Sequence, residues 1–185
     1  MKQNYKEILY DNETIATQRL ILRKFTKNDA AAVLDYGSNA EVLKYLKWEG
    51  VKTLDEALAN IVNFAWSAPG IYAIEEKTSA VCIGCVELRL VPKHEKATFA
   101  YILSKSHWGK GYMTEALKAI LRLCFEDLQL NRVEACYSVG NDGSGKVMTN
   151  CGMVLEGVAK EQEKIKGKFM DIAHYGITKS MWENM

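Results

Sequence analysis

Trp108–Thr114 reads WGKGYMT and stands between an apolar segment and the longest amphipathic segment of the chain. Upstream, AYILS at residues 100–104 has the composition of a strand, and downstream Met113–Leu128 carries apolar residues at helical spacing. Glycines allow the backbone to approach an anion closely, and a helix N-terminus offers unpaired N–H groups and partial positive charge. The stretch therefore predicts a strand, a glycine turn and a helix that together bind a diphosphate.

A second glycine-rich stretch, Gly140–Val147, nearly matches the nucleotide-binding pattern G-x-x-x-x-G-K-[ST]. Val147 stands where a Ser or Thr would ligate magnesium, and the helix expected over Ser144–Asn150 is short. A P-loop hydrolase is therefore the weaker interpretation, and it predicts binding of ATP with magnesium.

The length and composition of the chain limit the classes of protein to which it can belong. The chain has 185 residues, 48% hydrophobic and 25% charged, with two prolines, so we expect one domain over 1–185 with an N-terminal extension at 1–14. The net charge of +1 gives no reason to expect nucleic-acid binding. No apolar run approaches the roughly 18 residues of a membrane span. Five cysteines without a signal-peptide core predict reduced thiols and a cytoplasmic location.

Cys82 and Cys85 form a lone C-x-x-C in a strand-like segment, AVCIGCVELRLV. Residues three apart on a regular strand point to opposite faces, and no nearby His completes a zinc set. We therefore interpret both as strand cysteines rather than as a redox or metal site.

The remaining pattern predicts an antiparallel meander followed by a strand–helix–strand unit, hence an α/β (α+β) fold with a mixed, mostly antiparallel sheet of six to seven strands and helices on both faces. Strands are expected at Arg19–Phe25, Ile71–Glu75, Val81–Val91, Ala97–Ser104, Arg132–Val139, Val154–Val158 and Asp171–Met181. Helices are expected at Asn28–Gly37, Glu41–Leu46, Thr53–Trp66, Met113–Leu128 and Ser144–Asn150, with Asn28, Asn39 and Thr53 as caps. The apolar face of the third helix is expected to hold Leu54, Leu58, Ile61, Val62 and Ala65.

Ser106–Ala116, SHWGKGYMTEA, resembles motif A, [QR]-x-x-G-x-[GA], of the GCN5-related N-acetyltransferases (GNAT). The form WGKGYxTEA is typical of the RimJ/RimL-type branch, which acetylates protein N-termini and assorted small amines. Other segments follow the same family order over nearly the whole chain: Thr17–Arg23, Asn39–Trp48, Leu130–Ala135, Asn141–Met153 and Glu156–Gly157. The resemblance implies the GNAT fold and acetyl transfer from acetyl-CoA, without a metal, to a primary amine by direct attack in a ternary complex.

The same resemblance implies a set of site residues. The donor would contact Ile102, Leu103, Ser104, Trp108, Gly109, Lys110, Gly111, Tyr112, Met113, Thr114, Asn141, Ser144 and Lys146. Ser144 would protonate the departing CoA thiolate, although a Ser after a turn is also a common helix N-cap. Glu163 is the first candidate for general base, although its charged surroundings equally suit a solvated face. A backbone N–H near Leu103 would polarise the thioester carbonyl.

Two positions depart from the family pattern. Ser106 replaces the first Gln or Arg of motif A, and Thr98 replaces an acidic residue to which a general base is sometimes assigned. The loss at Thr98 keeps open a catalytically silent acyl-CoA-binding module. The acceptor is expected to be a protein N-terminus or a small amine, and neither nucleic acid nor a membrane is expected as a partner. A homodimer is left open. Four aromatic side chains are expected to line the acceptor groove: Tyr45, Trp48, Trp66 and Tyr101.

Overall fold

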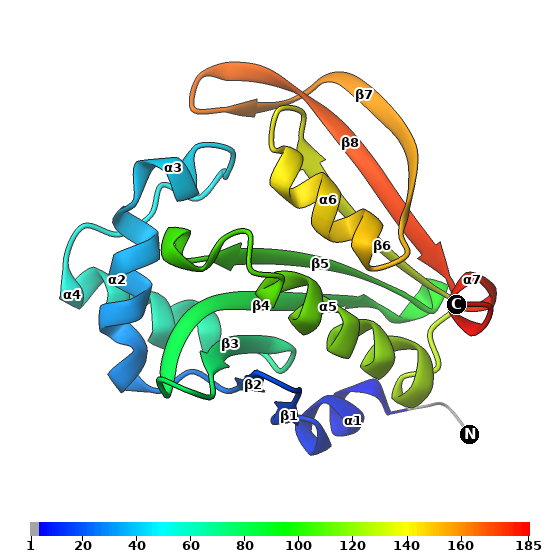
Figure 1. Ribbon diagram of the computed structural model, residues 1–185, viewed down its shortest axis with the longest axis horizontal. Coiled ribbons are helices and arrows are strands. Elements are labelled where there is room, and N and C mark those ends of the chain that lie inside the picture. Colours follow the sequence, from blue (N-terminus) through cyan, green and yellow to red (C-terminus); the bar gives the residue numbers. More distant parts are fainter. Residues whose placement is uncertain (1–3) are drawn as a thin grey trace.

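The computed structural model describes residues 4–185, which form an eight-stranded mixed sheet with helices on both faces (Figure 1). The strand order is β1-β2-β3-β4-β5-β6-β8-β7, and β5 with β6 is the one parallel pair among the described residues. The strands are β1 (Ile15–Ala16), β2 (Leu20–Arg23), β3 (Ile71–Glu76), β4 (Val81–Val91), β5 (Lys96–Leu103), β6 (Arg132–Ser138), β7 (Val154–Ile165) and β8 (Lys168–Thr178). The sheet thus has one strand more than expected, because two-residue β1 is too short to produce an alternating pattern.

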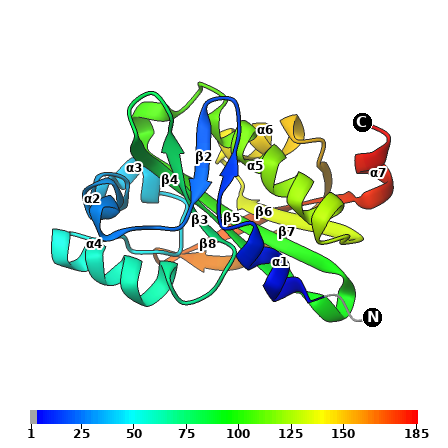
Figure 2. The same ribbon diagram turned by 90° about the horizontal axis from the view of Figure 1, so that it is seen from below.

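Within residues 4–185, seven α-helices accompany the sheet: α1 (Tyr5–Asp11), α2 (Ala30–Ser38), α3 (Ala40–Leu43), α4 (Leu54–Asn60), α5 (Tyr112–Arg122), α6 (Asp142–Asn150) and α7 (Lys179–Glu183). Helices α5 and α6 lie on one side of the sheet, and α2 and α4 lie on the other (Figure 2). Each side has its own apolar core. Leu117 and Ile120 of α5 are completely buried in the first, and Val33 of α2 and Ile61 are buried in the second.

The segment expected to be one helix over Thr53–Trp66 consists of α4 followed by a π-helical turn, Ile61–Ala65. Thr53 caps it as expected, since its hydroxyl accepts from the Glu56 N–H at 3.1 Å. The expected apolar face is wrong in part, because Leu54 and Val62 are exposed. The buried stripe is Ala57, Ile61 and Ala65, four residues apart, and is therefore narrower than the apolar pattern.

The other helix boundaries differ by a few residues. Asn39 caps α3, as expected, but Asn28 caps nothing, because Thr26 begins the short 3₁₀ turn before α2. The long helix expected through Leu128 is α5 followed by a π-helical turn, Leu123–Asp127.

The C-terminal hairpin is longer than expected. Strand β7 continues to Ile165 instead of ending at Val158, and its charged residues apart from half-buried Glu163 are exposed because it is the edge strand of the sheet. Strand β8 runs from Lys168 to Thr178, whose hydroxyl caps α7, so the last expected strand both begins and ends three residues too late. The tip of this hairpin reaches the α3 region (Figure 1), where Lys166 Nζ donates to the Leu43 carbonyl at 2.9 Å.

Cys82 and Cys85 lie in the same apolar core, not on opposite faces. In the pairing with β3, Ile74 is opposite Gly84 and Glu75 is opposite Cys82, so Ile83 is an extra residue that reverses the alternation. Burial raises the pKa of the Cys82 thiol to about 12 and raises that of Cys85 as well. Both thiols are therefore poor nucleophiles.

Candidate active site

The parallel strands β5 and β6 stay together for only part of their length. Their register joins Lys96 with Arg132, Ala97 with Val133 and Thr98 with Glu134, and it ends there. Beyond Thr98, β5 continues to pair with β4 up to Leu103, while β6 pairs with β8 up to Ser138. The facing edges of β5 and β6 therefore diverge into a wedge-shaped opening in the middle of the sheet.

The glycine turn lies at the end of β5. Gly109 and Gly111 both have positive φ, at 72° and 78°, a conformation that favours glycine. A Cβ at Gly109 would meet no atom within 4 Å, so the loop surface is open there. Gly111 is the N-cap of α5 without a side-chain cap, and the first N–H groups of this helix are available to a ligand. This geometry fits an anion such as a diphosphate.

Leu103 is held at the end of β5 by Trp108, whose indole Nε1 donates to the Leu103 carbonyl at 2.9 Å. The N–H of Ser104 bonds to Ile83 of β4 at 2.8 Å. Since successive strand residues present their N–H groups to alternate sides, the Leu103 N–H points away from β4 and into the wedge. It is placed to donate to a carbonyl oxygen there.

Helix α6 forms the opposite side of the wedge. Its N-cap is Asn141, so Ser144 lies inside the helix and is not the cap residue. The Tyr101 hydroxyl crosses from β5 and donates to the Ser144 carbonyl at 3.2 Å. The preceding turn needs Gly140, which has a φ of 101° and whose Cβ would lie 3.2 Å from the Tyr45 hydroxyl.

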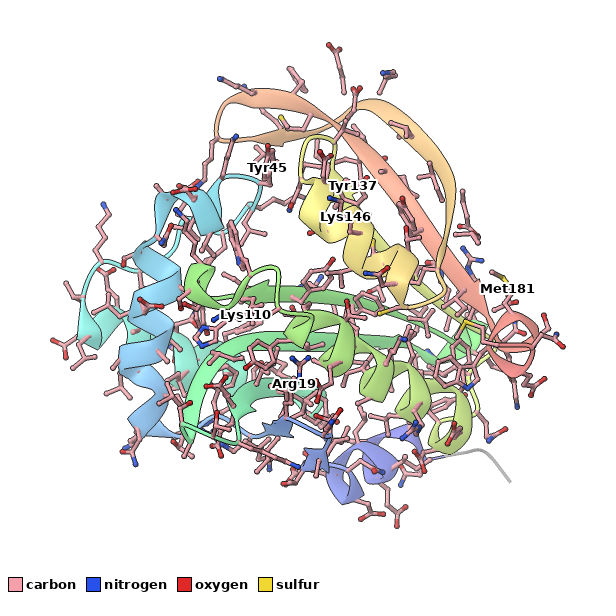
Figure 3. All side chains as sticks on the ribbon, viewed as in Figure 1. Arg19, Tyr45, Lys110, Tyr137, Lys146 and Met181 are labelled. Carbon is pink, nitrogen blue, oxygen red and sulfur yellow. The ribbon has the colours of Figure 1, made fainter. Side chains whose placement is uncertain are left out.

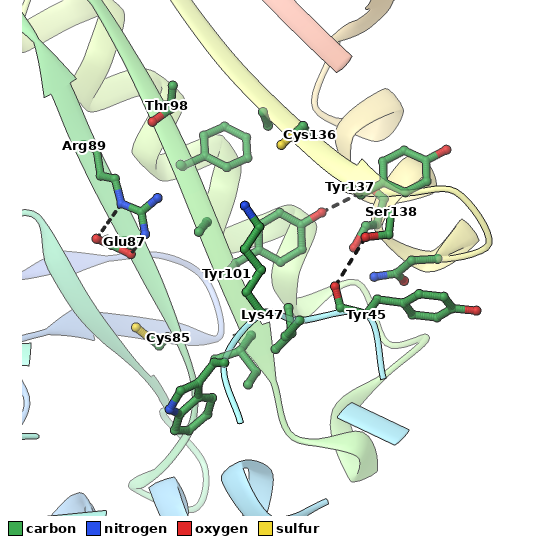
Figure 4. A pocket seen from close by; sticks show the side chains of 18 of the residues that line it. Tyr45, Lys47, Cys85, Glu87, Arg89, Thr98, Tyr101, Cys136, Tyr137 and Ser138 are labelled. Carbon is green, nitrogen blue, oxygen red and sulfur yellow. Dashed lines mark hydrogen bonds and ion pairs between the residues drawn. The ribbon is translucent and has the colours of Figure 1, made fainter. Parts of the chain in front are cut away.

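A cavity of about 760 Å³ opens next to the wedge, between the α2–α4 side of the sheet and the C-terminal hairpin. Figure 4 shows Lys47, Cys136 and Tyr101 converging on it. It contains these residues of the expected site: Tyr45, Trp48, Tyr101, Ile102, Asn141, Ser144 and Glu163. The structure thus brings these residues together although they are far apart in the chain.

Other expected residues lie outside the cavity lining. Trp66 is outside the lining, and its indole donates to the Phe25 carbonyl at 2.8 Å. Ser104 is buried and its hydroxyl donates a hydrogen bond to the Asp35 carboxylate at 2.6 Å, so this proton is used within the protein and not for a ligand. Lys146 is exposed on α6, as Lys110 is on the loop before α5 (Figure 3), and neither belongs to the cavity lining.

Among the described residues, four carboxylates line the cavity, and Glu163 is the one expected from the sequence. Glu163 pairs with Lys47 at 2.7 Å, Glu87 pairs with Arg89 (Figure 4), and Glu134 and Glu156 pair with Arg132. The three carboxylates that were not expected, Glu87, Glu134 and Glu156, lie on strands. The alternation of polar and apolar residues along a strand shows which side chains are polar but not which of them meet. Their convergence depends on register, which puts Glu134 directly beside Thr98.

Glu134 is the nearest registered carboxylate to the position that Thr98 occupies. Partial burial raises its pKa, but the hydrogen bonds from Lys96 and Arg132 outweigh burial, so the pKa of Glu134 lies below its usual value. A carboxylate held ionised in this way accepts a proton weakly. Glu134 therefore does not replace the missing acid as a general base.

The comparisons with known proteins agree with this geometry. Residues 19–154 match the family model of the acetyltransferase (GNAT) domain. An uncharacterised N-acetyltransferase p20 of Bacillus licheniformis is 30% identical over 172 residues, covering 90% of this chain and 97% of the relative. The crystal structure of a GNAT-family acetyltransferase from Bacillus anthracis superposes with a TM-score of 0.82 at 25% identity, covering 90% of this chain and 99% of that one.

Some of the relatives have named acceptors, and two of them illustrate the range. The ribosomal protein uS5-alanine N-acetyltransferase of Escherichia coli is 28% identical, covering 91% of this chain and 92% of the relative. The spermidine N(1)-acetyltransferase of Vibrio cholerae is 26% identical, covering 90% and 96%. The family model spans most of the chain, including the wedge and the glycine turn. The chain belongs to the GNAT acetyltransferase family and is an enzyme that transfers an acetyl group to an amine.

Proposed function

We propose that acetyl-CoA binds with its diphosphate on the Trp108–Thr114 turn, its pantetheine arm in the wedge and its thioester at the cavity. The observation that carries this placement is the parting of β5 and β6 after three registered pairs. The opening joins the exposed N-terminus of α5 to the cavity, and strand edges along it offer backbone N–H and C=O groups to the amides of the arm. Asn141 and Ser144 flank this path on α6.

Three groups of this chain carry the proposed chemistry. The Leu103 N–H polarises the thioester carbonyl while a neutral amine attacks its carbon. Glu163, acting through water, takes the proton of the amine, and Ser144 gives a proton to the sulfur as the C–S bond breaks. Direct attack in a ternary complex requires donor and acceptor to occupy the wedge and the cavity together.

We propose a protein N-terminal α-amine, in the manner of the RimJ/RimL-type branch, as the preferred acceptor. Each of the four cavity carboxylates is already paired with a Lys or Arg of this chain, which leaves little net charge to attract a polycation. An α-amine, with a pKa of about 7.7–8.0, is also partly neutral at pH 7, whereas a Lys amine at about 10.4 is not. The cavity's aromatic end, with Tyr36, Trp48 and Phe64, suits an apolar residue near that N-terminus.

Calorimetric titration with acetyl-CoA, followed by thiol release on an amine panel, tests both proposals. We expect acetyl-CoA to bind without magnesium and an alanine-starting peptide to give a higher kcat/KM than spermidine or free lysine. Binding without turnover on any amine would support the silent acyl-CoA module, and preferred turnover of spermidine would overturn the α-amine proposal. The five free cysteines fit a reducing cytoplasmic setting, and a homodimer stays a prediction.

Ser144→Ala is expected to lower kcat at least about tenfold, a threshold set below the roughly hundred- to ten-thousandfold contribution typical of one proton-transfer group. The Kd of acetyl-CoA should change little, because the backbone of α6 is unaltered. Ser180→Ala, on α7 and outside the cavity, is the matched control. An unchanged kcat in Ser144→Ala would remove this residue from the proton-donor role.

A further inference from the structure

Arg19 contacts the glycine turn although it is ninety residues away in sequence. It immediately precedes β2, and its Nη1 donates to the Lys110 carbonyl at 2.9 Å. Its Nη2 would lie 3.5 Å from a Cβ on Gly111, and its guanidinium stacks on the Tyr112 ring with 4.4 Å to the centroid. One side chain thus touches three successive residues of the turn.

Arg19 is itself fixed by Glu115 in the first turn of α5. The Arg19 Nε and backbone N–H donate to the two Glu115 oxygens at 2.6 and 2.7 Å, and the Thr17 hydroxyl donates to the same carboxylate at 2.6 Å. Partial burial raises the pKa of Glu115, but the bonds from Thr17 and Arg19 outweigh it and lower the pKa overall. Glu115 is therefore an ionised anchor that orients the guanidinium fork.

The bond to Lys110 determines where the next N–H points. A trans peptide unit is planar, so its carbonyl and its N–H point in opposite directions. Because Arg19 holds the Lys110 carbonyl on the β2 side, the Gly111 N–H is turned away from β2, toward the open side of the turn. Free glycine-flanked peptides rotate easily, and without this bond the orientation would be one of several.

We infer that Arg19 is a positioning residue for the donor, holding the Lys110–Gly111 peptide so that the Gly111 N–H faces the diphosphate. The inference rests on the proposed placement of acetyl-CoA at this turn. A point charge at residue 19 would not suffice, because the fork must reach Glu115 and Lys110 at once. The role also links the Thr17–Arg23 segment to motif A, two parts of the chain that the sequence pattern leaves unconnected.

Titration of Arg19→Gln and Arg19→Lys with acetyl-CoA and with S-acetylpantetheine, which lacks the diphosphate, tests this role. Both substitutions should raise the Kd of acetyl-CoA roughly tenfold, which is the equivalent of one charge-assisted hydrogen bond. They should change the Kd of S-acetylpantetheine by less than about twofold. Arg122→Gln, at the far end of α5, is the control and should bind both ligands as the wild type does. Thermal unfolding of each variant shows whether it is folded, and Arg19→Lys decides the question should Arg19→Gln not fold.

Three results would overturn the inference. Normal binding by Arg19→Lys would show that charge alone is required. Equal weakening of both ligands would show general damage to the wedge, and unchanged acetyl-CoA affinity in both variants would show that the peptide needs no support. Failure of the wild type to bind acetyl-CoA would instead remove the proposed donor site, which is a separate outcome.

Discussion

Glu163→Gln is expected to lower kcat about a hundredfold, within the range for loss of a general base. Glu163 lines the same cavity as Ser144 and Tyr45, and its side chain is 24% exposed, which leaves room for a bridging water. The amide keeps the shape of the side chain but cannot take a proton. The Kd of acetyl-CoA should stay unchanged, because the hairpin residue is remote from the glycine turn.

Two controls separate base catalysis from the other function of Glu163, its ion pair with Lys47. Lys47→Met removes the pair and keeps the carboxylate, so it should retain most of the wild-type kcat. Glu161→Gln alters an exposed glutamate of the same strand outside the cavity and should be silent. A kcat in Glu163→Gln equal to that of Lys47→Met would limit Glu163 to its ion pair with Lys47 and move the base elsewhere, with Glu87 as the next candidate.

Asp29→Asn is expected to lower the free energy of unfolding by about 3 kcal/mol or more, as loss of one partner of a buried ion pair does. The Asp29 carboxylate is 6% exposed and receives the fork of Arg23 at 2.8 and 2.9 Å and the Thr26 N–H at 2.7 Å. The Arg23 guanidinium then keeps its ion pair with Glu75 at 2.6 Å and its hydrogen bond to the Lys24 carbonyl at 2.9 Å, but it loses its second carboxylate charge. Urea denaturation measures the loss, and exposed Asp55→Asn in α4 should cost less than about 1 kcal/mol.

The ion pair of Asp29 with Arg23 also predicts that part of the free energy of unfolding is lost in acid. Burial raises the pKa of Asp29, but the bonds from Arg23 and Thr26 outweigh burial and lower it overall. Because the folded-state pKa is below the unfolded value of about 3.9, the stabilisation is complete above that value and is lost as the pH falls through the folded-state pKa. Asp29→Asn should therefore lose less stability than the wild type between neutral and acid pH, and parallel curves would contradict this account.

Local patterns predicted most of the fold, and register determined most of the remainder. The strand–turn–helix at Trp108–Thr114 follows from glycine chemistry and helical periodicity, so it was readable without the structure. The common face of Cys82 and Cys85 depends on one extra residue in β4, which composition does not reveal. The charged stretch of β7 resembles a solvated loop, yet it is a strand because β8 supplies its backbone partners.

The candidate site divides in the same way. Ser144, Asn141 and the glycine turn belong to short local motifs, and the structure places them on the two sides of one opening. The contact of Arg19 with Lys110 joins segments separated by most of the N-terminal half, and no spacing rule connects them. Trp66 had the right residue type for an acceptor wall, but a single hydrogen bond to Phe25 holds it outside the cavity.

The divergence of β5 and β6 determines the width of the cavity floor. The floor of the cavity is shared, with Ala100 and Ile102 from one strand and Cys136 from the other. The width of this floor therefore equals the separation of β5 and β6, which pair only along a seam of three residues, Lys96–Thr98 with Arg132–Glu134. Ala97 and Val133 are fully buried in that seam, so a change of side-chain volume at either position is expected to alter the separation of β5 and β6 and with it the width of the cavity floor.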